Sequence, residues 1–67
     1  MGTRSPYYGM TVNERLGVAG LFEQWDTAGR ARDRAAMVAI LKSVDLGDEP
    51  SEETVDIVLA NPARYSL

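Results

Sequence analysis

The chain has 67 residues and a formal net charge of −3, and it contains neither cysteine nor histidine. The absence of these two residue types excludes disulfides and thiolate metal sites, and it removes the bases and nucleophiles that enzymes use most often. Hydrophobic residues make up 45% and charged residues 25%, which indicates one small globular domain rather than a disordered chain. We therefore expect a protein that is not an enzyme and that holds no cofactor and no metal.

No segment of the sequence suggests a membrane. The longest apolar run, residues 35–41, is too short to cross a bilayer, and the N-terminus lacks the apolar stretch of a signal peptide. A chain without cysteine also fits a reducing compartment. The expectation is a soluble cytoplasmic protein with no membrane contact.

Residues 1–10 predict an irregular arm, because they show no periodicity and contain Pro6 and two glycines. Tyr7 and Tyr8 are the aromatic residues that could pin this arm onto the body. Residues 11–67 then form the folded domain.

The first helix is predicted over residues 11–29. Thr11 and Glu14 have the spacing of a capping box, and Gly29 suits the left-handed position after a helix. The apolar residues of this helix lie on two different faces, which suggests that other elements contact the helix on two sides. Gly17 and Gly20 lower the helix propensity, so either another backbone approaches there or the helix is weak.

Two shorter helices follow, over residues 33–45 and 51–60. Asp33 is the expected N-cap of the first and Ser51 of the second, while Gly47 and Pro50 separate them. Pro62 ends the last helix. The fold class is all-α, a small three-helix bundle in which the first two helices are antiparallel neighbours. The predicted core consists of Leu16, Phe22, Trp25, Met37, Ile40, Leu41, Val44, Val55, Val58 and Leu59.

Three short motifs lie along the domain: NERL at residues 13–16, RDRAAM at 32–37 and ANPARY at 60–65. With them the chain resembles a group of short, uncharacterised bacterial proteins over residues 10–66. The group has no established activity. The resemblance implies a small helical fold and transfers no site residue.

An arginine cluster at residues 30–34 raises the question of nucleic-acid binding. Arg30, Arg32, Arg34 and Lys42 are the residues that would contact phosphates. The favoured interpretation is a solvated joint between helices, with ion pairs to acids such as Asp26, Asp45 or Asp56, because a basic stripe with interleaved aromatic residues is missing. A gel-shift assay at low salt separates the two hypotheses.

The leading functional hypothesis is a non-enzymatic interaction protein: a homodimer, an adaptor or an inhibitor. A chain this short has a small core and gains stability from self-association. The expected interface residues are Val12, Leu16, Ala19, Trp25 and Ile57. The competing expectation is that the arm covers the same surface within one chain.

Overall fold

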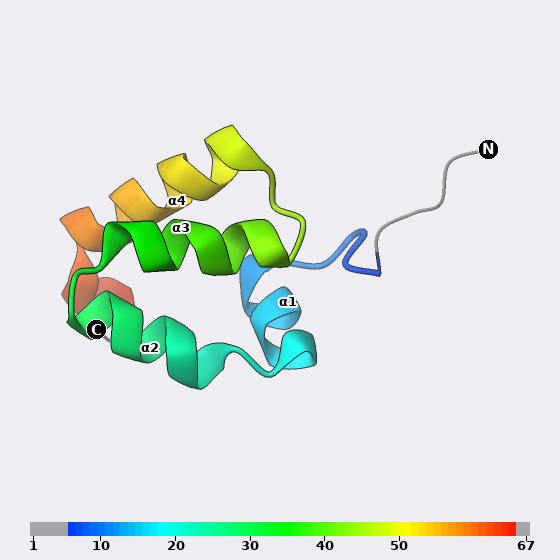
Figure 1. The fold of residues 1–67 in the computed structure, drawn as a ribbon, viewed down its shortest axis with the longest axis horizontal. Helices are drawn as coiled ribbons and strands as arrows, with labels where there is room; N and C mark the ends of the chain where they lie inside the picture. The colour runs from blue at the N-terminus through cyan, green and yellow to red at the C-terminus, as the bar shows by residue number, and fades with distance from the viewer. Residues whose placement is uncertain (1–5, 66–67) are drawn as a thin grey trace.

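The computed structural model describes residues 6–65, whose regular elements are all helices, with no strand among them (Figure 1). The elements are α1 (Val12–Ala19), α2 (Phe22–Arg30), α3 (Arg34–Ser43), α4 (Asp48–Ala60) and the short 3₁₀ helix η1 (Pro62–Tyr65). The all-α prediction is confirmed, whereas the prediction of three helices is wrong: the described residues form four α-helices.

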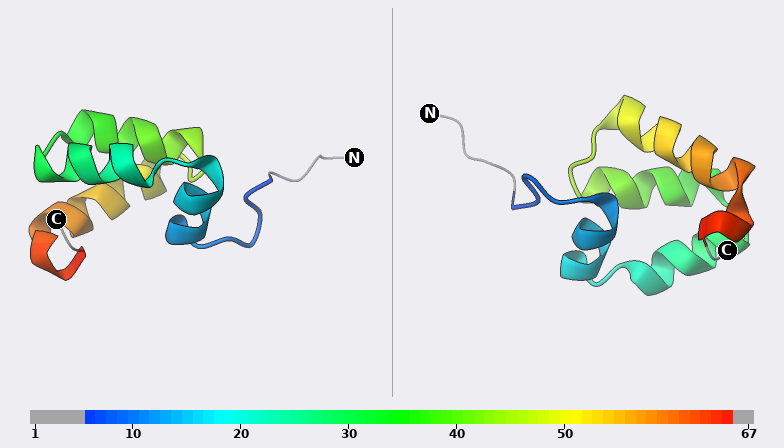
Figure 2. Two further views of the ribbon diagram at one scale, coloured as in Figure 1. Left: turned by 90° about the horizontal axis from the view of Figure 1, so that it is seen from below. Right: turned by 180° about the vertical axis from the view of Figure 1, so that it is seen from behind.

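The layout is a hairpin of helices extended at both ends. α3 lies between α2 and α4, and short turns join it to each of them, so neighbouring helices run antiparallel (Figures 1 and 2). α1 crosses the end of this layer where α2 begins and α3 ends, and η1 packs against the end of α4. Because α1 and η1 leave the plane of the other helices, they create a surface that a plain three-helix bundle would lack.

The predicted first helix is broken at Gly20. The Thr11–Glu14 capping box is present and begins α1 as expected. Gly20 then adopts a left-handed conformation with φ of 70°, and the Leu21 N–H donates to the Leu16 carbonyl at 2.9 Å. This is a Schellman turn, in which glycine ends a helix without a steric cost. The glycine that was expected to weaken one helix instead separates two.

The same turn ends the next two helices, but without glycine. Arg32 follows α2 with φ of 54°, and Asp45 follows α3 with φ of 61°. The Asp33 N–H donates to the Ala28 carbonyl at 2.9 Å, which repeats the bond pattern of the first turn. Gly29, the predicted left-handed residue, lies inside α2 and is buried. That prediction is wrong because the left-handed residue that follows α2 is Arg32, three positions later.

Arg32→Gly should therefore raise the free energy of unfolding by about 0.5–1 kcal/mol. The change removes the cost of a left-handed non-glycine residue, about 1–2 kcal/mol, but glycine also gives the unfolded chain more conformational entropy, which offsets part of the gain. Urea unfolding measures the change. Gly20→Ala is the matched control: no atom lies within 4 Å of an added Cβ, so any loss reports the strain at positive φ alone. A less stable Arg32→Gly protein would contradict this account.

The last helix begins three residues earlier than predicted. α4 starts at Asp48 after Gly47, and Pro50 lies in its first turn, where the backbone N–H that proline lacks has no partner within the helix. Ser51 is thus not the N-cap. It is fully buried, and within residues 6–65 its hydroxyl has no hydrogen-bond partner.

Ser51→Ala should raise the free energy of unfolding by about 1 kcal/mol, because an unpaired buried hydroxyl costs about 1–3 kcal/mol and alanine is also the better helix former. The control is Ser43→Ala at an exposed position, where the hydroxyl donates to the Ile40 carbonyl and little change is expected. Thermal melts of both variants test the difference. A clear loss at Ser51 would show that its hydroxyl is bonded.

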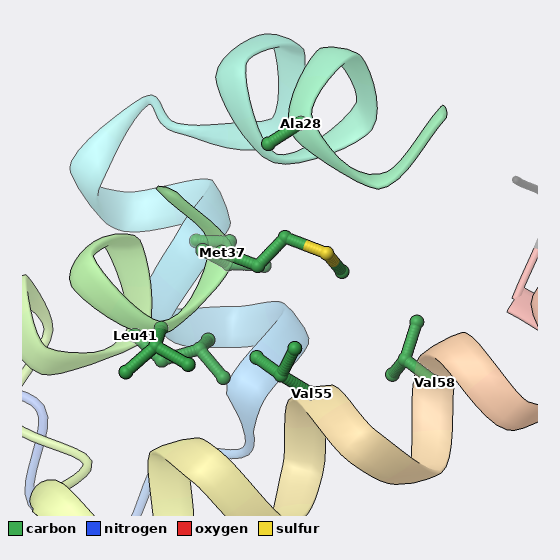
Figure 3. Packing of buried hydrophobic residues seen from close by; sticks show 7 residues of the cluster. Ala28, Met37, Leu41, Val55 and Val58 are labelled. Atoms are coloured by element: carbon green, nitrogen blue, oxygen red, sulfur yellow. The ribbon is translucent and has the colours of Figure 1, made fainter. Parts of the chain in front are cut away.

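The core lies where α2, α3 and α4 face one another, closed at one end by α1. Met37 of α3 extends between Ala28 of α2 and the valines of α4, Val55 and Val58 (Figure 3). Six of the ten predicted core residues are fully or nearly fully buried: Leu16, Met37, Leu41, Val44, Val55 and Val58. Three more are partly buried and pack against this cluster: Trp25, Ile40 and Leu59.

Phe22 is the predicted core residue that the structure contradicts. Its side chain is 49% exposed, because the turn at Gly20 changes the direction of the chain and α2 presents a different face from the one a continuous helix would present. Ala28 and Val38 are buried in its place, and neither was predicted. The observed core therefore contains two smaller residues, Ala28 and Val38, and lacks the aromatic side chain that the sequence predicted there.

Candidate interaction surface

A groove lined by both apolar and polar side chains lies where α1, α2, α4 and η1 meet. It has a volume of about 480 Å³, and we call it the Trp25 groove. Trp25 of α2 is half-buried in it, and the tail element η1 closes one side. Its lining residues are Thr11, Val12, Asn13, Trp25, Thr54, Val58, Arg64 and Tyr65. Apolar and aromatic side chains mixed with hydroxyl and amide groups are typical of a binding surface.

Two apolar side chains are exposed at the junction of α1 and α2. Val18 is 66% exposed and Phe22 is 49% exposed, and we call them the Val18–Phe22 corner. The Phe22 ring covers Gly17, since a Cβ on Gly17 would lie only 3.2 Å from its Cε2 atom. Gly17 stands one turn after Asn13 on the same face of α1, and Asn13 lines the groove. The corner and the groove therefore adjoin.

The structure brings together only part of the predicted interface. Val12 and Trp25 meet in the groove, and Ala19 is half-buried near the end of α1. Leu16 is fully buried in its own core and offers no surface, which corrects its place among the interface residues. Ile57 is 56% exposed on α4 but does not line the groove. The candidate surface also contains Val18, Phe22 and Tyr65, which the sequence analysis did not name as interface residues.

The arginine cluster is largely paired with carboxylates. Arg30 lies 3.1 Å from Asp26 one turn earlier on α2, and the Arg34 guanidinium donates to both oxygens of Asp56, at 2.8 and 3.3 Å. Ion pairs between the arginine cluster and two of the three acids named from the sequence, Asp26 and Asp56, are thus present. Lys42 lies 3.5 Å from Asp48, while Arg32 occupies the exposed turn between α2 and α3.

The Arg34–Asp56 pair links α3 to α4 on the surface. The hydrogen bonds from Arg34 lower the pKa of the Asp56 carboxyl, and the same bonds raise the pKa of Arg34. Because the folded pKa of Asp56 lies below the unfolded one, its contribution to stability is present above the unfolded pKa and is lost as the pH falls through the folded pKa. Both side chains are exposed, so the contribution is small.

Arg15 makes contacts that the sequence did not suggest. From α1 its guanidinium donates to the carbonyl of Met10 at 3.1 Å, and to the carbonyls of Val44 and Asp45 at 3.1 and 3.0 Å. The last two acceptors lie at the C-terminal end of α3, where unpaired carbonyls carry partial negative charge. Arg15 thus fixes the base of the arm and the end of α3 to the same helix.

A second groove, of about 550 Å³, runs between α2 and α3. Its lining residues are small or polar: Gly20, Glu23, Gln24, Thr27, Ala28, Ala31, Asp33, Ala36 and Ile40. The Asp33 carboxylate already accepts the Ala36 N–H as the N-cap of α3, as the sequence predicted. No aromatic side chain lines this groove, which distinguishes it from the Trp25 groove.

Neither a metal-binding cluster nor a membrane-spanning helix is found in the described part of the chain. Residues 6–65 contain no group of three or more carboxylates placed to share a metal ion. The same residues include no helix with both the length and the apolar character needed to cross a bilayer. Of the two grooves described, the Trp25 groove is the one lined by aromatic side chains, Trp25 and Tyr65.

Comparison with family models, with curated proteins and with solved structures found no match to this chain, so the resemblance to short bacterial helical proteins stays a prediction.

Proposed function

We propose that the protein is a non-enzymatic protein–protein interaction module, and that its first partner is a second copy of its own chain. The observation that carries the proposal is the Trp25 groove, with its two aromatic lining residues, together with the exposed apolar side chains of the Val18–Phe22 corner. If the protein acts as an adaptor or inhibitor, it would do so in the form of this homodimer.

The composition of the surface supports association. Tryptophan and tyrosine are the residue types most often found at the energetic centre of interfaces, and Trp25 and Tyr65 both line the groove. Four separate elements contribute to it, so it is formed before a partner arrives and costs little to organise. A two-fold contact would bury the same patch on both copies and add to a core that, among the described residues, has no fully buried aromatic side chain.

The charges support a protein partner over a nucleic acid. Phosphate binding by the arginine cluster would compete with the carboxylates beside Arg30, Arg34 and Lys42. α4 adds Glu49, Glu52 and Glu53 to the exposed acidic surface. Nucleic-acid association through this cluster remains the alternative class, with its gel-shift test, but no contact in the structure favours it.

Charge substitutions at two exposed apolar residues test the proposed surface. Phe22→Asp should raise the dissociation constant of the dimer at least about tenfold, because a buried unpaired carboxylate costs well over 1.4 kcal/mol. Ile57→Asp is the matched control, equally exposed but outside the groove, and should leave the constant unchanged. Size-exclusion chromatography with light scattering over a range of concentrations measures both.

The opposite pattern, with Ile57→Asp dissociating the dimer and Phe22→Asp leaving it intact, would place the interface on the outer face of α4 and overturn the assigned surface. Circular dichroism of each variant establishes that it is folded before the constants are compared.

A further inference from the structure

The Trp25 groove has one charged lining residue, and that residue is a base. Arg64 of η1 lines the groove together with Trp25 and Tyr65, and no aspartate or glutamate lines it. The other groove, between α2 and α3, is lined by Glu23 and Asp33 and by no base. On a chain of net charge −3, the Trp25 groove is therefore the one of the two in which a negatively charged group meets an opposite charge.

The Arg64 guanidinium is not engaged by a carboxylate of its own chain. Arg30, Arg34 and Lys42 each lie at most 3.5 Å from an aspartate, whereas no ion pair or side-chain hydrogen bond involves Arg64 within the described part of the chain. The Arg64 backbone N–H donates to the Asn61 carbonyl at 3.1 Å, which fixes η1 to the end of α4. The backbone of this arginine is thus held in place while its charge stays available to a ligand.

The size and the walls of the groove suit a small molecule with an aromatic ring. Its volume of about 480 Å³ lies within the range of about 300–1,000 Å³ that is typical of small-ligand sites. Trp25 is half-buried and Tyr65 is 40% exposed, so both offer accessible aromatic surface to a second ring. The side chains of Thr11, Asn13 and Thr54 also line the groove, and their hydroxyl and amide groups can donate to a carboxylate oxygen.

We propose that the Trp25 groove is a binding site for a small aromatic carboxylate. The ring would lie against Trp25 and Tyr65, and the carboxylate would accept hydrogen bonds from the planar guanidinium of Arg64, whose geometry matches its two oxygens. Residues 6–10 do not line the groove, so the described part of the arm does not fill it. The inference goes beyond the proposed homodimer and does not require it, because all the lining residues belong to one chain.

Tryptophan fluorescence tests the site directly, because Trp25 is the one tryptophan of the sequence and its emission reports on the groove. Titration of 3-phenylpropionate into the full chain at about 1 μM should give a saturable change with a dissociation constant of about 1 mM or lower. Two matched compounds separate the contributions of ring and charge. The amide 3-phenylpropionamide has the ring without the charge, acetate has the charge without the ring, and each should bind at least about tenfold more weakly.

Arg64→Gln should raise the dissociation constant of 3-phenylpropionate about tenfold, because the variant removes the charge that faces the carboxylate and keeps a polar side chain. Arg32→Gln is the matched control. Arg32 is also exposed, but it lies in the turn between α2 and α3 outside the groove, so its replacement should leave the constant unchanged. Equal binding of the amide, an unchanged constant in Arg64→Gln, or the lack of a saturable change would each overturn the site.

Failure of the ligand site and failure of the homodimer are separate results. A chain that dimerises in sedimentation but shows no saturable binding of 3-phenylpropionate at about 1 μM would overturn the ligand site alone. A chain that binds the compound with the expected contrasts and stays monomeric would support the ligand site and overturn the homodimer.

Discussion

Leu16→Ala should lower the free energy of unfolding by about 3 kcal/mol, whereas Phe22→Ala should lower that of the monomer by less than about 1 kcal/mol. Both residues were expected in the core from the sequence. Leu16 is fully buried among residues of the other helices, so its truncation leaves a cavity. About half of the Phe22 side chain is exposed and its ring lies against Gly17, so truncation to alanine removes little buried apolar surface.

Urea unfolding at low protein concentration measures both changes without a contribution from association. For a domain of this size, about 3 kcal/mol corresponds to a fall of roughly 12–24 °C in melting temperature, which puts Leu16→Ala close to unfolding. Equal losses for the two variants would mean that residues 12–30 form one continuous helix with Phe22 inside, and would contradict the turn at Gly20.

Arg15→Met should lower the free energy of unfolding by about 2–3 kcal/mol. Methionine keeps most of the length and apolar character of the side chain but leaves the carbonyls of Met10, Val44 and Asp45 without their donor. Each hydrogen bond to a charged group contributes about 1.5–3 kcal/mol, and exposure of some of these carbonyls to water offsets part of the sum. Arg15→Lys should restore little, since an ammonium cannot span the three acceptors as a planar guanidinium does.

The matched control for Arg15 is Arg30→Met. Arg30 also makes a polar contact, but it is an exposed ion pair with Asp26 within one helix. Such pairs contribute about 0.3–0.5 kcal/mol, so the melting temperature should move by only a few degrees. If both variants lost the same small amount, the bridge between α1 and the end of α3 would have no energetic role.

The sequence predicted those local features in which side chain and backbone partner lie within a few residues. The Thr11 capping box and the Asp33 N-cap were both identified, because each depends on a spacing of three residues. The turns between the helices were harder to predict from the sequence. Gly20 ends a helix as glycine often does, and aspartate, as at Asp45, adopts the left-handed conformation more readily than most residues, but nothing in the residue type of Arg32 predicts it.

The candidate surface was predictable only in part, because it depends on how distant elements cross. Trp25 was suspected as an anchor from its size. Phe22 became a surface residue only through the turn at Gly20, and Tyr65 joined the groove only because η1 turns back after α4. Arg15 was missed for the same reason: two of its three acceptors lie 29 and 30 residues away along the chain.

The turn at Gly20 links stability to the proposed function. The hydrogen bond from the Leu21 N–H to the Leu16 carbonyl ends α1 with Leu16 directed into the core, and the chain then restarts with Phe22 facing outward. The same few residues therefore contribute to the buried core and to the open apolar corner. Removing this apolar corner would be a small loss to the monomer and a large loss to the dimer.

Sedimentation equilibrium of the unmodified chain, over a concentration range from about 1 μM to about 1 mM, tests the homodimer most directly. The account predicts a mass that rises from one chain to two across this range, together with a melting temperature that increases with concentration. A single-chain mass throughout, with a melting temperature that does not move, would contradict it.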